Sequence, residues 1–228
     1  MATEGINLKS ARLDALFKEC KSCKTFADVG SDHGFLPLKM ASESKANLII
    51  SSDVSSKCVE KSRANANIYG LQDKIQFIVS DGFTSYPQVS LDGVVISGMG
   101  GLMIAKILEE KPKNVKIKNF YLQPNTKVLE LRQYLTSHGY KINKDFVVRE
   151  GDKFYFILSV GEGGQQLSEI DLQFGVSRFN ENEADFLAYL DYEESKLKNL
   201  LNPKNQGKFG SKLQLICQLR REQNERKN

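Results

Sequence analysis

Short apolar runs alternate with longer amphipathic stretches along the first 160 residues, and this alternation predicts strands and helices in turn. The expected strands are residues 25–30, 47–53, 74–81, 92–98 and 119–124. The expected helices begin after Ser10 and then cover residues 35–44, 55–68, 102–110 and 127–137. Two more strands, 140–150 and 153–160, flank Gly151-Asp152, a dipeptide typical of a two-residue hairpin turn.

Five strand–helix alternations with nearly continuous apolar strands favour a parallel sheet with helices on both faces. Because crossovers between parallel strands are right-handed, the expected fold is a doubly wound α/β sheet. In such a sheet the ligand cleft opens at the carboxyl ends of the strands. We expect this sheet domain to cover residues 1–161, followed by a smaller domain over residues 162–228.

The composition excludes several classes of protein. The most apolar long window, residues 91–105, contains Asp92, Ser97 and four glycines, which makes it too polar for a membrane-spanning helix. The N-terminus has no apolar stretch like that of a signal peptide, so we expect a cytoplasmic protein with no membrane partner. Cys20 and Cys23 form a lone CxxC pair in a chain with two histidines, so we expect neither a metal site nor a redox function.

The net charge of +4 is unevenly distributed along the chain. Residues after Gly161 contain ten Lys and Arg and eleven Asp and Glu, whereas the preceding residues contain 22 and 17. The positive excess on the first part of the chain is compatible with a polyanionic partner such as nucleic acid. Many proteins with a pI near 8.7 nevertheless bind none.

Polar residues and glycines gather where the expected strands end. These segments are Asp28 to Gly34, Asp53, Asp81-Gly82, Ser97 to Gly101 and Gln123 to Asn125. Because parallel strands end at one edge of a sheet, all five segments are expected to border the cleft. Folding alone gives little reason for such a collection on one edge of an apolar sheet, so the pattern indicates a binding site.

Three of these segments carry an acid, and each acid has a binding and a structural interpretation. Asp28 suits a ligand ammonium, with Gly30 letting the ligand approach the backbone, or it caps the turn. Asp53 suits a ribose diol, or it caps the following helix. Asp81 suits the exocyclic amine of adenine while Gly82 admits the ring, or the pair forms an Asp-Gly turn.

The loop after the first strand distinguishes two cofactor classes. A nicotinamide enzyme would place a pyrophosphate on G-x-G-x-x-G, but here the loop reads G-S-D-H-G, with Asp32 where the second glycine would fall. A carboxylate is unsuited to a pyrophosphate, and it suits S-adenosyl-L-methionine, which carries an ammonium and a sulfonium and no phosphate. A seven-stranded, Rossmann-like sheet with one antiparallel strand is also the usual methyltransferase architecture. We therefore expect S-adenosyl-L-methionine as the cofactor.

The segments ADVGSDHGFLP, ISGMGG and LQPN together resemble the bacterial tRNA (adenine-N1)-methyltransferases that modify the adenosine at tRNA position 22, in the D-arm region. The resemblance covers roughly residues 8–160 and continues more weakly into a helical tail. It implies a class I fold, S-adenosylmethionine as methyl donor, tRNA as substrate and a C-terminal coiled-coil-like domain. The residues that it implies for the donor are Asp28, Gly30, Ser31 and Asp32 around the methionine moiety, Asp53 and Val54 at the ribose, Asp81 and Gly82 at the adenine, and Gly98 beside the transferred methyl group.

The segment after the fourth strand indicates which atom is methylated. Many enzymes that methylate exocyclic amines have an N/D-P-P-Y segment there, and Gly98 to Gly101 offers neither its amide nor its aromatic ring. Ring N1 needs no strong general base, because its lone pair is free at neutral pH and catalysis is mainly positioning. The candidate catalytic residues are Asp32, His33, Met99, Gly100, Gln123 and Asn125.

Two pairs among these candidates have alternative roles. Asp32 and His33 are close enough to stabilise the cationic product or to steer the base, although His33 also fits an ordinary loop position. Gln123 and Asn125 fit the Watson–Crick edge or the ribose of an extruded nucleotide, or Asn125 caps the next helix.

The last part of the chain predicts two helices. One apolar stripe comprises Leu187, Leu190, Leu197 and Leu201, the turn-rich residues 202–211 break it, and a second comprises Leu213, Ile216 and Leu219. This pattern predicts an antiparallel helical hairpin of coiled-coil type. The hairpin is either a lid that stabilises the sheet domain or a clamp for RNA. The phosphate contacts of such a clamp would be Lys204, Lys208, Lys212, Arg220 and Arg221.

The expected function is methyl transfer from S-adenosyl-L-methionine to N1 of an adenosine in tRNA, by a monomeric enzyme. Two alternatives stay open on the sequence alone. One is another RNA or small-molecule methyltransferase on the same fold, and the other is a non-catalytic adaptor that binds RNA or a nucleoside.

Overall fold

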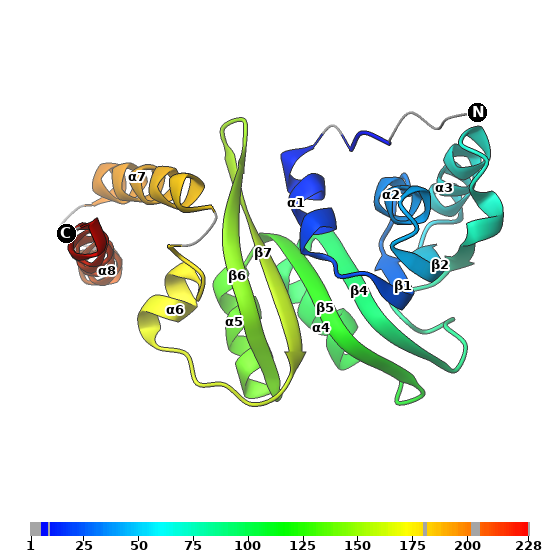
Figure 1. Ribbon diagram of the computed structural model, residues 1–228. Helices are drawn as coiled ribbons and strands as arrows, with labels where there is room; N and C mark the ends of the chain where they lie inside the picture. The colour runs from blue at the N-terminus through cyan, green and yellow to red at the C-terminus, as the bar shows by residue number, and fades with distance from the viewer. Residues whose placement is uncertain (1–5, 9, 180–181, 202–205, 228) are drawn as a thin grey trace.

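The computed structural model describes residues 6–8, 10–179, 182–201 and 206–227. At its centre these residues form a seven-stranded sheet in the order β3-β2-β1-β4-β5-β7-β6 (Figure 1). The strands are β1 (Cys23–Val29), β2 (Ala46–Asp53), β3 (Ile75–Val79), β4 (Val89–Gly100), β5 (Val115–Thr126), β6 (Tyr140–Glu150) and β7 (Lys153–Glu162). Strands β1 to β5 pair in parallel, and β7 is antiparallel to both of its neighbours. The structure confirms the doubly wound sheet with one antiparallel strand.

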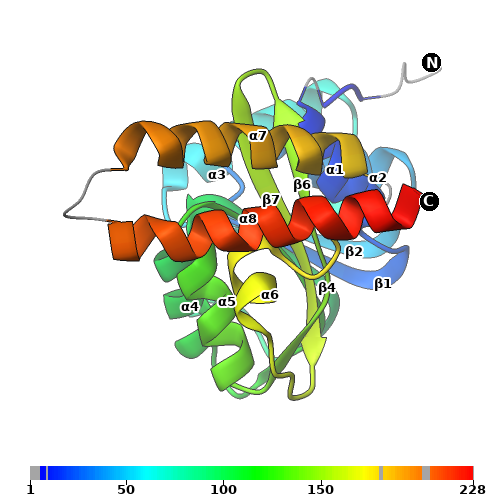
Figure 2. The same ribbon diagram turned by 90° about the vertical axis from the view of Figure 1, so that its left-hand side faces the viewer.

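The described chain ends in two helices, α7 (Glu183–Leu200) and α8 (Gln206–Lys227). They run side by side in opposite directions next to β6 (Figure 2). Buried leucines and isoleucines join them to the sheet: Leu190, Leu197, Ile216 and Leu219 belong to the same apolar cluster as residues of β4 and β5. None of the described helices combines the length and hydrophobicity that crossing a membrane requires.

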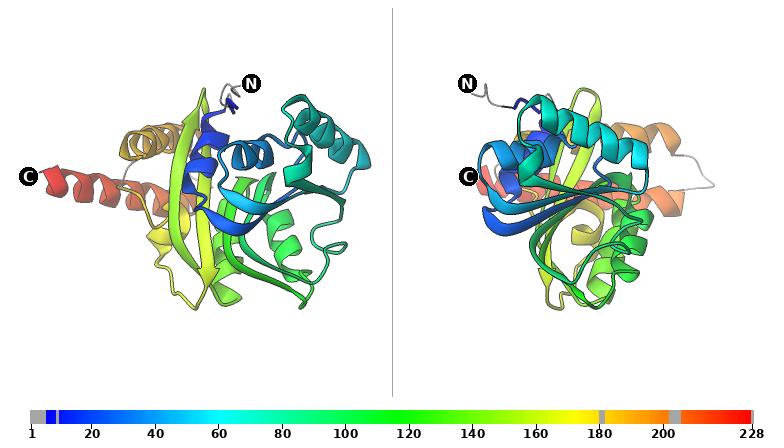
Figure 3. Two further views of the ribbon diagram at one scale, coloured as in Figure 1. Left: turned by 45° about the vertical axis from the view of Figure 1, so that its right-hand side comes forward. Right: turned by 90° about the vertical axis from the view of Figure 1, so that its right-hand side faces the viewer.

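The remaining helices cover the two faces of the sheet (Figure 3). One face carries α1 (Ala11–Glu19), α2 (Phe35–Ser42) and α3 (Ser56–Ile68), and the other carries α4 (Gly101–Glu109), α5 (Val128–Ser137) and α6 (Glu169–Phe174). The first face is packed around Leu16, Leu38 and Phe26, and the second around Ile104 and Leu131. Each helix thus buries its apolar side against the sheet, as the alternating pattern predicted.

Several details differ from the expected elements, and three of them follow. The strands β4 and β5 continue to Gly100 and Thr126, two residues beyond their expected ends, with register shifts at Ser97, Met99 and Gly100. The short helix α6 was not expected, and the capping box of Ser168 and Asp171 starts it. The expected turn over residues 202–211 was wrong for residues 206–211, which belong to α8. Packing of α8 on α7 outweighs the low helix propensity of its two early glycines.

Candidate active site

The carboxyl ends of β1 and β4, which are neighbouring parallel strands, open onto a cavity of about 260 Å³. The predicted site residues that line it are Asp28, Gly30, Ser31, Asp32, His33 and Gly98. Arg12 and Leu13 of α1 and Phe35 and Leu36 of α2 complete much of the wall. The loop between β1 and α2 therefore forms one side of the cavity, and Ser97 and Gly98 near the end of β4 face it.

Asp28 is the buried acid of this cavity. It is the penultimate residue of β1 and is 6% exposed. Burial raises the pKa of Asp28 to about 6, and the nearby carboxylate of Asp53 adds to the increase. A carboxylate that has lost its hydration is stabilised by a cation that enters the cavity, because the cation replaces the missing water. The site is therefore suited to a positively charged group such as an ammonium.

Gly30 and Met99 meet where the loop after β1 faces the end of β4. Gly30 has a φ of +81°, and a Cβ at this position would lie 2.1 Å from Cε of Met99. Glycine therefore satisfies both the backbone conformation and the space. The unbranched Met99 side chain lies against Gly30, and it can change rotamer when a ligand approaches that backbone.

Gln123 of β5 holds the irregular end of β4. It is fully buried, and its Oε1 accepts hydrogen bonds from the N–H of Gly98, at 3.1 Å, and from Nη1 of Arg12. Its Nε2 donates to Oδ1 of Asn125 at 3.1 Å, and Nδ2 of Asn125 donates to the carbonyl oxygen of Gly98 at 2.7 Å. Asn125 does not cap α5, whose N-cap is Lys127. This closed set of hydrogen bonds fixes the positions of Gly98 and Asn125 relative to each other.

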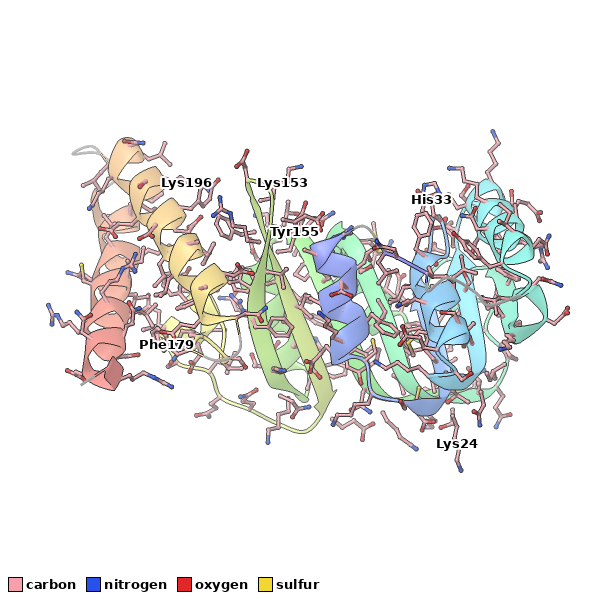
Figure 4. All side chains as sticks on the ribbon, turned by 45° about the horizontal axis from the view of Figure 1, so that its top comes forward. Lys24, His33, Lys153, Tyr155, Phe179 and Lys196 are labelled. Carbon is pink, nitrogen blue, oxygen red and sulfur yellow. The ribbon has the colours of Figure 1, made fainter. Side chains whose placement is uncertain are left out.

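Asp32 and His33 lie at the rim of the cavity, about half exposed. Nε2 of His33 is 3.2 Å from Oδ2 of Asp32, and Nζ of Lys61 is 3.5 Å from the other carboxylate oxygen. A hydrogen bond from the Cys58 thiol is the main reason why the pKa of Asp32 is lowered. The His33 ring stacks on Phe35, with ring centroids 5.5 Å apart, and Figure 4 shows His33 beside α2. The Asp32 charge is thus shared with its neighbours on α3.

The other predicted donor residues lie along the same edge of the sheet, outside the cavity. Asp53 ends β2, and Asp81 and Gly82 follow β3, the next strand in the sheet. Oδ1 of Asp53 accepts the N–H of Ser55 at 2.8 Å, so one carboxylate oxygen holds the turn. Val54 is 67% exposed. Asp81 is also exposed.

The acidic residues and glycines along this edge fit S-adenosyl-L-methionine. It presents the acids Asp28, Asp53 and Asp81 at the ends of three adjacent strands, beside glycines that expose backbone. A pyrophosphate would meet several of these carboxylates and be repelled, whereas a cationic nucleoside would be attracted.

Comparisons with known proteins agree with this chemistry. Residues 9–158 match the model of a methyltransferase domain family. The tRNA (adenine(22)-N(1))-methyltransferase of Bacillus subtilis is 29% identical over 163 residues, which are 71% of this chain and 68% of that protein. A structure of Streptococcus pneumoniae Sp1610 in complex with S-adenosyl-L-methionine is 31% identical, covers 92% of this chain and 98% of its own, and has a TM-score of 0.83.

The chain belongs to the family of tRNA (adenine(22)-N1)-methyltransferases. A further structure of this kind is M. capricolum TrmK in complex with S-adenosyl-homocysteine, at 26% identity and a TM-score of 0.81, covering 93% of this chain and 98% of its own. The resemblance seen in the three sequence motifs is therefore confirmed, and so is the class of cofactor.

Sequence reasoning missed one residue of the methyltransferase site. Arg12 lies far from every motif in the chain, in the first turn of α1, and the fold brings it to Gln123 and the cavity. An arginine in the helix that precedes the first strand of a doubly wound sheet was the available signal. That signal is weak without a structure, because most arginines at such positions face solvent.

A wider groove, of about 520 Å³, begins at Asn125 and continues between β7 and α7 of this methyltransferase. Its aromatic lining is Phe154, Tyr155, Phe156, Tyr189 and Tyr192, and its lysines are Lys127, Lys153, Lys196 and Lys212. Figure 4 shows Lys153 and Tyr155 on β7 and Lys196 on α7, on either side of it. Among the described residues Lys153 has no ion-pair partner, whereas Lys127 pairs with Glu130 at 2.8 Å, and Lys196 and Lys212 pair with Glu193 at 3.6 Å and 2.6 Å. The groove combines rings with positive charge and is continuous with the active-site edge at Asn125.

Two of the cations expected to clamp RNA have partners within the helical pair. Nζ of Lys212 is 2.6 Å from Oε2 of Glu193, and Arg220 forms an ion pair with Asp191. Both bridges connect α8 to α7. Arg221 is exposed, Lys208 lies in α8, and Lys204 is outside the described residues.

Proposed function

We propose that this methyltransferase transfers the methyl group of S-adenosyl-L-methionine to N1 of adenosine 22 in tRNA. The observation that carries the proposal is the joint occurrence of acidic residues at the strand ends with the similarity to the Bacillus subtilis tRNA (adenine(22)-N(1))-methyltransferase. The alternatives of a small-molecule methyltransferase or an adaptor have no comparable support.

The segment at the end of β4 favours ring N1 over the exocyclic amine as the acceptor. Enzymes that methylate the amine grip its hydrogens with a side-chain amide and a free backbone carbonyl. Here residues 98–101 supply neither the side-chain amide nor the aromatic ring of such a site. The remaining requirement is to align N1 with the methyl group, which is catalysis by positioning.

In this proposal each residue along the sheet edge binds a different part of the methyl donor. S-adenosyl-L-methionine, when bound, supplies a methyl group activated by its sulfonium. Asp28 binds the ammonium, Asp53 the ribose hydroxyls, and Asp81 the adenine amine, while Val54 covers the ring. Met99 and Gly100 border the reacting atoms. No residue needs to remove a proton before transfer, since N1 of adenine is unprotonated at neutral pH.

Asn125 and Gln123 have different tasks at the acceptor. Asn125 is exposed, and its Oδ1 keeps one lone pair for the amine of an extruded adenine. Gln123 is buried with both ends of its amide occupied, so it positions Asn125 and does not meet the base. Asp32 and His33, at the rim, stabilise the cationic product.

We further propose that the tRNA extends from Asn125 along the groove between β7 and α7, and that residues 162–228 form a coiled-coil domain that supports this contact. Rings and lysines together suit unpaired nucleotides and their phosphates. A monomer suffices for this arrangement, because α7 covers the outer strand β6 (Figure 2).

The direct test incubates the protein with unmodified bulk tRNA and labelled donor, followed by nucleoside mass spectrometry. We expect 1-methyladenosine and no N6-methyladenosine. A transcript carrying guanosine at position 22 is the matched control and should stay unmethylated. Binding of donor and tRNA without any methylated product would identify an adaptor and overturn the proposal.

A further inference from the structure

The cavity at the ends of β1 and β4 raises a question of charge balance. The amino-acid end of S-adenosyl-L-methionine carries a carboxylate as well as an ammonium. Asp28 can neutralise the ammonium, and the same acid would repel the carboxylate. The inference rests on the proposed function, which calls for a cation in the same cavity to balance the carboxylate of the ligand.

Arg12 is the guanidinium that lines this cavity. Its Nη1 lies close to the loop at the end of β4, since a Cβ on Gly98 would be 3.6 Å from that atom. The two other basic side chains nearby are less suitable. His33 and Lys61 are both within ion-pair distance of Asp32 at the rim.

The guanidinium of Arg12 has no ion-pair partner in the described chain; burial opposes the effect, but the charge of Arg12 is one of the causes that lower the pKa of Glu150. No carboxylate of the described residues lies within ion-pair distance of its guanidinium, and its side-chain hydrogen-bond acceptor is the neutral amide of Gln123. Its Nε is buried and has no hydrogen-bond partner. An arginine has five N–H donors, so most of its capacity remains for a ligand. A buried donor without a partner also makes a change of rotamer toward a ligand inexpensive.

The backbone of Arg12 is held firmly by hydrogen bonds, while its side chain keeps N–H donors that no protein group uses. Oε2 of Glu150 accepts hydrogen bonds from the Arg12 N–H at 2.9 Å and from the Ser10 hydroxyl at 2.7 Å. These bonds tie the start of α1 to the end of β6. The guanidinium carbon lies 5.2 Å from the centre of the Tyr155 ring, which supports its flat face. The edge of the guanidinium stays available for a planar, bidentate partner.

We infer that Arg12 binds the α-carboxylate of S-adenosyl-L-methionine, opposite the Asp28 site for its ammonium. The two charges of the ligand's amino-acid end then meet opposite charges on α1 and β1. This arrangement would make the cavity selective for ligands that carry both groups.

The test compares two ligands on two proteins by isothermal titration. The ligands are S-adenosyl-homocysteine and its decarboxylated analogue, S-adenosyl-3-thiopropylamine, which keeps the ammonium. The wild-type protein should bind S-adenosyl-homocysteine roughly 10- to 100-fold more tightly, the range for hydrogen bonds to a charged group. Arg12→Gln should lose most of this preference, with little change in affinity for the analogue.

Controls separate this role from a structural one. Arg63 lies on α3, and its guanidinium packs over the ring of Phe77 on β3. Arg63→Gln should keep the full preference for S-adenosyl-homocysteine. Arg12→Lys should retain part of it, and thermal unfolding without ligand verifies that each variant is folded. Equal loss of affinity for both ligands in Arg12→Gln, or no loss for either, would overturn the inference and leave the proposed function intact. Absence of S-adenosyl-homocysteine binding by the wild-type protein would overturn both.

Discussion

The side-chain oxygen of Gln123 accepts the backbone N–H of Gly98 at 3.1 Å, and this bond joins the ends of two adjacent strands at the active-site edge. Gln123 is fully buried, so the irregular end of β4 that carries Gly98 is positioned from inside the sheet. Met99 and Gly100 follow directly and share this anchor.

Replacement of Gln123 by leucine should therefore slow methyl transfer more than it weakens donor binding. The change leaves the Gly98 N–H and Arg12 without an acceptor, at a cost of about 1–3 kcal/mol in the free energy of unfolding. We expect kcat on tRNA to fall at least tenfold, measured under saturating donor. Gln133→Leu on the exposed side of α5 is the control and should change neither quantity. A normal kcat in the Gln123 variant would show that the loop does not need this anchor.

Asp28→Asn should stabilise the free protein while impairing its function. The pKa of Asp28 is about 6 in the folded protein, against 3.8 for an ordinary aspartate, so the folded state binds more protons between these values. The free energy of unfolding of the wild type therefore falls as the pH rises from about 4 to about 6. Asp28→Asn does not lose this free energy. Its free energy of unfolding should exceed that of the wild type by about 3 kcal/mol at pH 8 and should equal it at pH 4.

The same variant should bind S-adenosyl-homocysteine at least tenfold more weakly at pH 8, because the ammonium loses its counter-charge. Urea unfolding and titration calorimetry at the two pH values check both effects. A variant that is less stable than the wild type at pH 8 would contradict the account of Asp28 as an unpaired buried carboxylate.

Asp53→Ala should weaken donor binding about tenfold, because a carboxylate at the end of β2 is expected to accept both ribose hydroxyls. Asp73→Ala, on an exposed acid before β3, is a matched control that should bind normally. If the two variants bound S-adenosyl-homocysteine equally well, the ribose would have to lie elsewhere.

Lys153→Ala should raise the KM for tRNA several-fold and leave the affinity for S-adenosyl-homocysteine unchanged. A lysine on a phosphate contributes to binding through counterion release, so the salt dependence of tRNA binding should also become less steep. Lys24→Ala tests the opposite end of the sheet, where Figure 4 shows Lys24 far from the groove, and should have no effect. Equal effects of the two variants would argue against a tRNA path along this groove.

The buried ion pair of Arg132 and Asp145 should be essential for stability. Nε of Arg132 is 2.7 Å from one carboxylate oxygen, both side chains are almost completely buried, and Nη1 donates to the carbonyl of Leu172. The pair thus links α5, β6 and α6. Asp145→Ala should lose about 3–5 kcal/mol, since an unpaired charge would stay buried. Asp14→Ala removes the exposed pair with Lys18 and should change the stability by less than about 1 kcal/mol.

Much of the fold followed from local patterns, because each strand and helix up to Val160 carries its own apolar periodicity. The acids at the strand ends were also predictable, since β1, β2 and β3 end in or beside Asp28, Asp53 and Asp81. Their grouping at one edge follows from parallel topology alone.

Contacts between residues far apart in the sequence could not be predicted from the local pattern. Arg12 reaches Gln123 from 111 positions away, and nothing in either segment indicates the pairing. The ion pairs of Lys212 and Arg220 with α7 likewise depend on how the two helices are aligned. The burial of Leu190 and Ile216 in the cluster of the sheet was one of two expected alternatives, because the stripe pattern suits either a free hairpin or a packed one.

The most direct measurement maps the methylated position on a single tRNA transcript. After incubation with S-adenosyl-L-methionine, primer extension should stop at adenosine 22, because a methyl group on N1 blocks Watson–Crick pairing. The account predicts this stop with the wild-type protein and its near absence with Asp28→Asn at equal donor concentration. Full-length extension with the wild type, or an equally strong stop with both proteins, would contradict it.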